Sequence, residues 1–241
     1  VRKHLVAEIK AHHRGDGAAS RPGDTVAPRQ AFRAARRAGA RPLRGLAANV
    51  TSRHLWLAGA TGVAGSLLLQ RLLADPDVGG ITTPGRRAPA LSDARVTTVS
   101  FDRLDAAPAP QAAFCCLGTT RKRAGSRAAF YAVDHDLVLQ FARAARARGC
   151  DRFFLMTAVG ADARSSSLYL ATKGRVEADV AKLGFADLQI FRPSFLIAPR
   201  TESRRVEAFV AAVAPYIEPL LVGGLRRYRA IPAESVVRAM A

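Results

Sequence analysis

The sequence has few cysteines and no long apolar run, and each shortage excludes a class of protein. Three cysteines in 241 residues, two of them adjacent at Cys115 and Cys116, cannot build a disulfide framework. A reducing compartment is therefore expected, and we predict a cytoplasmic location. The longest apolar candidate is interrupted by Pro215, Glu218 and Pro219, so no transmembrane segment is predicted.

Acidic residues are scarce as well, since 19 Asp and Glu stand against 37 Lys and Arg and leave a net charge of +18. Half of this excess lies in residues 1–53, which hold twelve Lys and Arg against three acids. The segment is rich in Arg, Ala and Gly and lacks a sustained apolar face, so we expect a disordered extension. Two alternatives are an organelle transit peptide and translated upstream sequence. A nucleic-acid partner is disfavoured, because the charge is concentrated outside the remaining chain.

Clusters of metal ligands are also lacking. The three cysteines and five histidines show no metal-binding spacing. His12 and His13 belong to the extension, and His135 is expected to be solvated on a helix surface. We predict no metal site.

From His54 onward, short apolar runs alternate with helical periodicity, which predicts an α/β fold with a parallel sheet. Pro84 cannot donate a hydrogen bond to a neighbouring strand, so the second strand is expected to end at Thr83. We expect one domain over residues 54–241, built on a doubly wound, Rossmann-type sheet. Strands are predicted at 54–58, 81–83, 96–101, 112–117, 152–157 and 188–191, and helices at 63–74, 130–148 and 167–183.

Three glycines spaced by three, Gly59, Gly62 and Gly65, stand between the first strand and the first helix. In this position Gly59 permits a sharp turn and Gly62 permits close approach of a pyrophosphate. Gly65 allows the helix to pack tightly against the strand. The unpaired N–H groups and the dipole of the helix favour a bound anion. The pattern predicts a dinucleotide-binding turn.

Two further motifs contain hydroxyl groups, one on the helix that follows the fifth predicted strand and one at the end of that strand. Tyr169 and Lys173 are four residues apart on a predicted helix and so share one face. A nearby ammonium lowers the pKa of a phenol and prepares it for acid–base chemistry, although a core-facing tyrosine beside a solvated lysine is the alternative. Thr157 ends the fifth strand, where its hydroxyl could bond a substrate carbonyl or be satisfied by its own backbone.

With these motifs in order, the chain resembles the short-chain dehydrogenase/reductase superfamily, and more narrowly its atypical branch of Tat-interactive-protein-like oxidoreductases. The resemblance covers residues 54–241. It is carried by Gly-Ala-Thr-Gly-Val-Ala-Gly (59–65), Gly-Arg-Arg (85–87), Cys-Cys-Leu-Gly-Thr-Thr (115–120), Val-Asp-His-Asp-Leu-Val-Leu (133–139), Gly-Ala-Asp (160–162), Tyr-Leu-Ala-Thr-Lys-Gly-Arg-Val-Glu (169–177) and Phe-Arg-Pro-Ser (191–194).

The resemblance implies roles for individual residues. Tyr169 would be the proton donor and acceptor, Lys173 its pKa-lowering partner, and Thr157 the counterpart of a catalytic serine. Asp134 stands where many relatives carry an Asn, which puts a proton relay through that position in doubt. The residues implied to bind cofactor are Gly59, Thr61, Gly62, Val63, Gly65, Arg86, Arg87, Asp102, Leu117, Gly118, Thr119, Lys173, Arg192 and Pro193.

The end of the second strand predicts which dinucleotide is preferred. A site for NAD places a carboxylate there, to hold the ribose hydroxyls. Here the chain reads Pro84-Gly85-Arg86-Arg87, and a guanidinium favours the 2′-phosphate of NADP. We therefore predict NADP(H) in preference to NAD(H).

These observations predict an NADP(H)-dependent oxidoreductase that acts on a small carbonyl or alcohol substrate. Residues 197–230 are expected to shape the substrate pocket. The alternative is a dinucleotide-binding regulatory protein that works through a protein partner with little catalysis. The threonine at position 157 and the aspartate at position 134 are compatible with that alternative.

Overall fold

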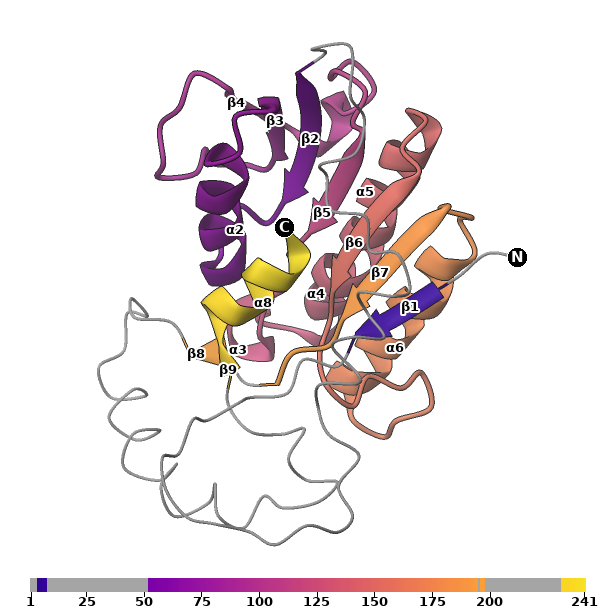
Figure 1. Ribbon diagram of the computed structural model, residues 1–241. Coiled ribbons are helices and arrows are strands. Elements are labelled where there is room, and N and C mark those ends of the chain that lie inside the picture. The colour runs from indigo at the N-terminus through magenta and orange to yellow at the C-terminus, as the bar shows by residue number, and fades with distance from the viewer. Residues whose placement is uncertain (1–3, 8–51, 195, 198–230) are drawn as a thin grey trace, which may run out of the picture. The chain divides into compact units, whose positions relative to one another are not determined.

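The computed structural model describes residues 4–7, 52–194, 196–197 and 231–241 of the chain. A parallel sheet in the order β1-β7-β6-β5-β2-β3-β4 organises them (Figure 1). The progression reverses between β2 and β5, which is the switch point of a doubly wound sheet. The fold is thus the predicted Rossmann-type α/β fold. The strands are β1 (His4–Ala7), β2 (Arg53–Ala58), β3 (Val78–Pro84), β4 (Val96–Val99), β5 (Ala112–Cys115), β6 (Arg152–Met156) and β7 (Asp187–Phe191).

Helices cover both faces of the sheet (Figure 1). One face carries α2 (Val63–Leu73) and α8 (Ala233–Met240). The other carries α4 (Arg127–Tyr131), α5 (Leu137–Ala147) and α6 (Leu168–Ala181). Two short elements, η1 (Phe101–Arg103) and α3 (Arg121–Ala124), lie in the connections. No helix within these described ranges is long and apolar enough to cross a membrane.

Successive side chains of β2 point to opposite faces of the sheet, so the core lies in two layers. Leu55 and Leu57 pack with α2 and α8, whereas Trp56 and Ala58 pack with α5 and α6. All four side chains are fully buried because the strand is covered on both faces. The Trp56 indole N–H donates to the carbonyl of Pro108 at 2.9 Å, so the buried ring leaves no polar atom unsatisfied.

The second strand is longer than predicted, because β3 includes Pro84. The N–H groups of Ile81 and Gly85 donate to carbonyls of Arg95 and Val99 on the β4 side. By alternation, the N–H missing at position 84 would face β2, whose paired register with β3 ends at Thr82. Proline therefore costs no hydrogen bond between strands, and the expected end at Thr83 is wrong.

Two features of residues 1–53 depart from the expected extension. Arg53 is the first residue of β2, and its guanidinium bonds Asp75 at 2.7 Å. Residues His4–Ala7 form β1, which pairs in parallel with the edge of β7 so that His4 lies opposite Leu188. A four-residue strand is too short to produce a periodic signal, so composition alone could not identify it. Residues 1–3 and 8–51 lie outside the described residues.

The helix predicted over 130–148 is interrupted by a π-helical turn. The segment η2 (Ala132–Asp136) separates α4 from α5 and buries Asp134 and His135. His135 was expected to be solvated, but it bonds Asp136 and Asp179 at 2.8 and 3.0 Å and stacks on Tyr131. The extra residue of a π turn rotates side chains that regular spacing would leave outside. Such turns occur frequently at functional sites.

Residues 198–230 of the expected substrate-side segment lie outside the described residues. On either side of them, β8 (Leu196–Ile197) pairs in parallel with β9 (Ile231–Pro232).

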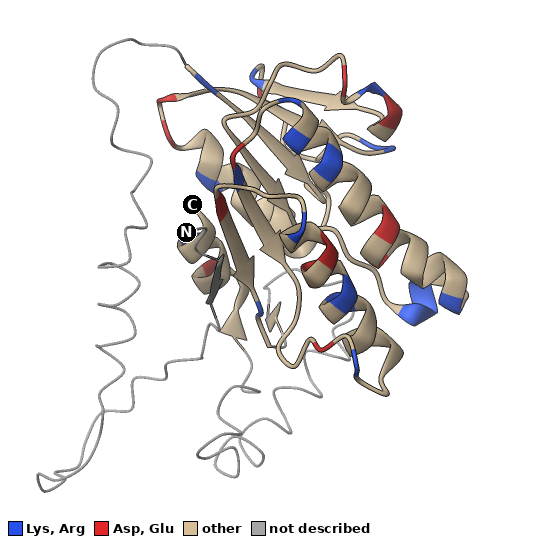
Figure 2. Cartoon of the chain, turned by 90° about the vertical axis from the view of Figure 1, so that its right-hand side faces the viewer, with Lys and Arg blue, Asp and Glu red and all other residues tan. Residues whose placement is uncertain are grey.

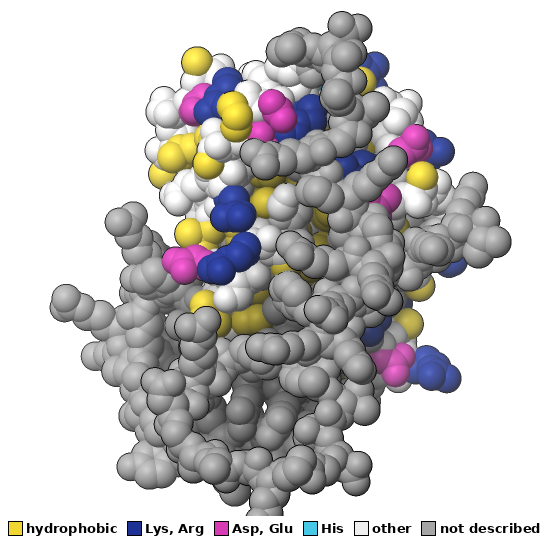
Figure 3. Space-filling model, in the orientation of Figure 1, with side chains coloured by type: hydrophobic (Ala, Val, Ile, Leu, Met, Phe, Trp, Pro, Cys, Tyr) yellow, Lys and Arg dark blue, Asp and Glu magenta, His cyan; other side chains and the backbone are white. Residues whose placement is uncertain are grey.

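Charged side chains of both signs are dispersed over the described surface. Figure 2 shows Lys and Arg interspersed with Asp and Glu along the helices that face the viewer. On the face in Figure 3, basic side chains stand in separate groups among hydrophobic and uncharged ones. A continuous basic stripe would be the signature of a nucleic-acid surface, and the visible described residues do not form one.

Candidate functional site

The glycine turn after β2 is built so that only glycine fits. Gly59 has a φ of +83°, and a Cβ there would lie 2.5 Å from the carbonyl oxygen of Cys116. A Cβ on Gly65 would lie 2.0 Å from the carbonyl oxygen of Gly59. The Gly62 N–H donates to that same oxygen at 2.9 Å, and α2 begins at the next residue. The turn therefore holds the start of α2 against the ends of β2 and β5.

The N-terminus of α2 is open to an anion. Thr61, Gly62 and Val63 are exposed. Gly62 is the N-cap and offers no side-chain cap, and the first turn contains no acid. The first N–H groups of the helix therefore lack an internal acceptor, and the helix dipole makes this end positive. These residues fit a phosphate group.

Basic side chains follow β3 at the same edge of the sheet. Arg86 and Arg87 are exposed and form no ion pair with any described residue. Beyond β4, Asp102 is exposed in η1, and a hydrogen bond from the Ser100 hydroxyl lowers the pKa of its carboxyl. Two guanidinium groups without a described ion-pair partner, at the sheet edge that also carries the glycine turn, suit a second anionic group.

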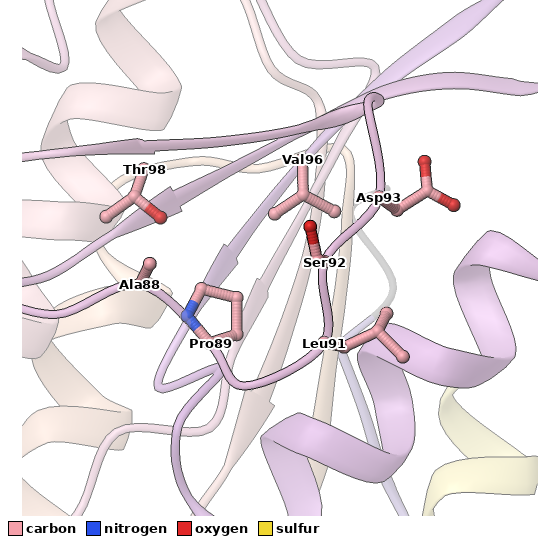
Figure 4. Close-up of a pocket in the computed structure, with 7 residues that line it drawn as sticks. All are labelled: Ala88, Pro89, Leu91, Ser92, Asp93, Val96 and Thr98. Carbon is pink, nitrogen blue, oxygen red and sulfur yellow. The ribbon is translucent and has the colours of Figure 1, made fainter.

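A pocket lies in the β3–β4 connection, which follows the two arginines. Its one ionisable lining group, Asp93, bonds Arg95, and this hydrogen bond lowers the pKa of Asp93 to about 2. A carboxylate with so low a pKa is a poor proton acceptor, and we assign no chemistry to this pocket. The pocket is lined by Ala88, Pro89, Leu91, Ser92, Asp93, Val96 and Thr98 (Figure 4).

Tyr169 and Lys173 lie one turn apart on α6, in opposite environments. The Tyr169 side chain is 41% exposed, with its ring packed against Phe130 of α4 at 6.0 Å between centroids. Lys173 is only 4% exposed. The alternative of a core-facing tyrosine and a solvated lysine is therefore wrong. An accessible phenol beside a buried ammonium is an arrangement able to exchange protons with a ligand.

Lys173 is paired with a buried carboxylate. Its Nζ lies 2.8 Å from Oδ1 of Asp134, in the π-helical turn. The other oxygen of Asp134 accepts the backbone N–H of Thr119 at 2.8 Å. A Cβ on Gly118 would lie 3.5 Å from Asp134 Oδ1 and 3.6 Å from Lys173 Nζ, so the loop after β5 passes directly over the pair.

The acidity of Tyr169 differs from the expectation. Partial burial raises the pKa of the Tyr169 hydroxyl above its ordinary value. The Lys173 ammonium lowers this pKa, but the Asp134 carboxylate opposes it. The sequence predicted only the effect of Lys173. Burial is the largest cause of the raised pKa, and Asp134 adds to it, so the effect of Lys173 is outweighed.

The Thr157 hydroxyl is hydrogen-bonded within a second buried cluster. Its hydroxyl, 7% exposed, donates to Oε1 of Glu177 at 2.5 Å, and Glu177 also accepts hydrogen bonds from Arg192. A hydroxyl has one proton, so Thr157 cannot simultaneously donate to a substrate carbonyl. The structure thus does not present Thr157 as the predicted polarising group. Sequence reasoning missed Glu177, although it lies four residues after Lys173 on the same helix.

We expect Thr157→Val to cost stability. The substitution keeps the volume but removes one hydrogen bond to a buried carboxylate that retains its Arg192 partner. The free energy of unfolding should fall by about 1 kcal/mol, measured by urea denaturation. Thr157→Ser, which keeps the hydroxyl, is the matched control. Equal stability of Thr157→Val and the original chain would show that the Thr157–Glu177 bond contributes nothing.

The cysteines are buried thiols. Burial raises the pKa of Cys115 to about 12 and that of Cys150 to about 11, and it raises the pKa of Cys116 as well. At neutral pH all three are uncharged and unsuited to nucleophilic attack. Among the described residues no group of His, Cys, Asp or Glu is arranged to hold a metal ion.

The predicted residues meet at the carboxyl ends of β2, β5, β6 and β7. The Gly59 turn abuts Cys116 and Leu117, and the Thr119 N–H reaches Asp134. The Val159 N–H after β6 donates to the carbonyl of Pro193 after β7 at 2.9 Å. In open α/β sheets ligands bind at this edge. The structure therefore joins the glycine turn and the Tyr169–Lys173 pair into one candidate site.

Comparison with known proteins identifies the family. The rat protein HTATIP2 is 39% identical over 198 residues, which cover 78% of this chain and 80% of that protein. The chain belongs to the atypical short-chain dehydrogenase/reductase family that includes HTATIP2. "Protein fmp52-1, mitochondrial" of Aspergillus oryzae is 34% identical, with coverage of 76% and 82%. No family model matches the chain.

Solved structures agree on the fold of this short-chain dehydrogenase/reductase. The Bordetella bronchiseptica enzyme WbmH, in complex with NAD+, superposes with a TM-score of 0.59 at 15% identity and covers 78% of this chain and 70% of that one. A Thermotoga maritima UDP-glucose 4-epimerase gives 0.57 at 13% identity, with coverage of 78% and 72%. At such identities the likeness concerns the fold alone.

The relatives correct one expectation. We predicted a cytoplasmic location from the low cysteine content, but the fungal relatives are named as mitochondrial proteins. The prediction of a cytoplasmic location is contradicted by these names. Low cysteine content indicates a reducing environment, and such an environment is not confined to the cytoplasm.

Proposed function

We propose that this protein is an NADP(H)-dependent oxidoreductase that interconverts a carbonyl and an alcohol. The observation that carries the proposal is the accessible Tyr169 phenol beside the buried Lys173–Asp134 pair, at the sheet edge that also holds the glycine turn. A proton-exchanging group and a phosphate-binding turn at one edge are the two parts that such a reaction needs.

The residues present fit a dinucleotide. The open N-terminus of α2 would receive the pyrophosphate, because its N-cap residue, Gly62, provides no side-chain acceptor for the N–H groups of the first turn. Arg86 and Arg87 would hold the 2′-phosphate of NADP, since neither is engaged by a described acid. The expected contacts of Asp102, Gly118, Arg192 and Pro193 remain part of this proposal. When bound, a nicotinamide supplies or accepts the hydride.

The chain's own residues handle the proton. In the direction of reduction, Tyr169 donates its hydroxyl proton to the substrate oxygen. In the buried pair beside it, Lys173 favours the phenolate left behind and Asp134 opposes this effect. Because 41% of Tyr169 is exposed, solvent can return the proton.

The preference for NADP is tested by calorimetric titration of the full chain with NADPH and NADH. Calorimetry is preferable to intrinsic fluorescence, because Trp56 is fully buried and bonded to Pro108. We expect tighter binding of NADPH, and we expect Arg86→Ala to weaken it about tenfold or more while leaving NADH unchanged, as one charge-assisted hydrogen bond is lost. Arg143→Ala, another exposed arginine on α5, should bind both as the original chain does.

A loss of affinity for both dinucleotides in Arg86→Ala would contradict a contact with the 2′-phosphate. Equal affinity for NADPH and NADH in the original chain would show that the two arginines do not select NADP.

One observation favours a second function, a dinucleotide-binding protein that acts through a protein partner. Because the Thr157 proton is engaged by Glu177, the substrate oxygen would lack the donor that the family's serine supplies. This alternative predicts dinucleotide binding without turnover across a panel of aromatic aldehydes, ketones and quinones. Measurable turnover of one panel member would decide in favour of the enzyme.

A further inference from the structure

The π-helical turn η2 places the Asp134 carboxylate beside the Lys173 ammonium, so that the two opposite charges cancel. Asp134 is fully buried and its Oδ1 lies 2.8 Å from Lys173 Nζ, a side chain that is only 5% exposed. A hydrogen bond from the Thr119 N–H holds Oδ2 at 2.8 Å. Two charges at this distance and depth act on their surroundings as a neutral pair rather than as a free cation.

Among the described residues, no other ionised group acts on Tyr169 in place of the cancelled charge of Lys173. In the part of the chain that the structure describes, the ionisable groups that act on Tyr169 are Lys173 of α6 and Asp134 of η2. The Cys115 thiol of β5 also interacts with the pair, but burial raises its pKa to about 12 and it is uncharged at neutral pH. Phe130 of α4, which packs on the Tyr169 ring, is apolar.

We propose that Asp134 is a positioning residue that neutralises Lys173 and so keeps Tyr169 a protonated phenol, the form that can give a proton to a carbonyl oxygen. A phenol can donate a proton to a carbonyl oxygen, whereas oxidation of an alcohol requires a phenolate to remove one. This inference rests on the proposed oxidoreductase function and names the residue that sets the protonation of its proton donor.

The reduction needs one hydride donor and one proton donor, and a nicotinamide and Tyr169 would supply them. In reduction, a reduced nicotinamide supplies a hydride to the carbonyl carbon, and the nicotinamide is oxidised. The O–H bond of Tyr169 breaks as its proton passes to the carbonyl oxygen, which yields the alcohol. Solvent then returns a proton to the phenolate.

The decisive measurement needs no cofactor or substrate. The full chain is titrated with base while tyrosinate absorbance is followed, and the Tyr169 contribution is taken as the difference from the Tyr169→Phe version of each variant. In the original chain Tyr169 should ionise above the ordinary value of about 10. In Asp134→Asn its midpoint should fall by about 1 pH unit or more, because Lys173 then acts as an uncompensated cation.

Asp136→Asn is the matched control. Asp136 lies in the same π-helical turn, but its carboxylate is exposed and bonds His135. The same chemical change there should leave the Tyr169 midpoint unaltered. An unchanged midpoint in folded Asp134→Asn, or an equal fall in Asp136→Asn, would overturn the proposal.

A double variant covers the case in which Asp134→Asn fails to fold because Lys173 is left unpaired. Asp134→Asn/Lys173→Met removes both charges, so a neutral pair replaces a neutral pair. The Tyr169 midpoint should then stay close to that of the original chain. A clear rise would show that Lys173 had been acting as a free cation and would refute the proposal.

The effect on catalysis is measured separately. With an active panel substrate, Asp134→Asn should shift the pH profile of alcohol oxidation to lower pH by as much as the midpoint shifts. If the midpoint falls and no substrate is turned over by any variant, Asp134 controls the phenol but the proposed oxidoreductase function is wrong. If turnover occurs and the midpoint does not move, the function stands and this inference fails.

Discussion

Tyr169→Phe is expected to reduce turnover about 100-fold to 10,000-fold, because it removes the hydroxyl whose proton the reaction transfers. Dinucleotide binding should persist, because the rest of the site is unchanged. The ring remains and keeps its packing against Phe130. Because 41% of the residue is exposed, removal of its hydroxyl should change the free energy of unfolding by less than about 0.5 kcal/mol. Turnover is measured by loss of NADPH absorbance with an active panel substrate, and binding by calorimetry.

The control for this loss is Tyr131→Phe. Tyr131 ends α4, where its ring stacks on His135 at 4.5 Å between centroids. The same hydroxyl deletion there should leave turnover as it is. If Tyr169→Phe turned over an efficient substrate at the original rate, Tyr169 would not be the proton donor, and another group would have to be found.

Gly65→Ala is expected to have the largest effect on stability. Its Cβ would lie 2.0 Å from the carbonyl oxygen, 2.7 Å from the carbonyl carbon of Gly59 and 3.1 Å from Cα of Ala60. All three are backbone atoms that cannot rotate away, so α2 would have to move off the turn. We expect a loss of about 3 kcal/mol or more, at the upper end of overpacking costs, together with loss of dinucleotide binding. Urea denaturation followed by circular dichroism measures the former.

Gly85→Ala is the matched control, because the nearest atom to its Cβ would be the carbonyl oxygen of Arg87 at an ordinary 3.6 Å. It should unfold within about 0.5 kcal/mol of the original chain. Equal stability of Gly65→Ala and Gly85→Ala would mean that α2 can shift at no cost, and the proposed rigidity of the phosphate-binding turn would be wrong.

Local sequence patterns were sufficient to predict features that lie within a single strand, turn or helix. The glycine spacing placed the β2 turn and the start of α2 to the residue, because the steric demands act over seven consecutive positions. Apolar runs and helical periodicity identified all six strands of 54–191 and the helix that carries Tyr169. They failed at Pro84, at β1 and at the π-helical turn. In each case the outcome depends on a hydrogen-bond partner from another element.

The sequence by itself determined the Rossmann-type fold, the glycine turn and the pairing of Tyr169 with Lys173 on one helix face. These follow from steric limits and periodicities that neighbouring residues impose. Only the tertiary structure decided which charged groups meet in the site. Asp134 lies 39 residues before Lys173, and Glu177 lies 20 residues after Thr157, so no local spacing relates them. Burial brings these groups within hydrogen-bond distance, where desolvation makes each charge depend on its partner.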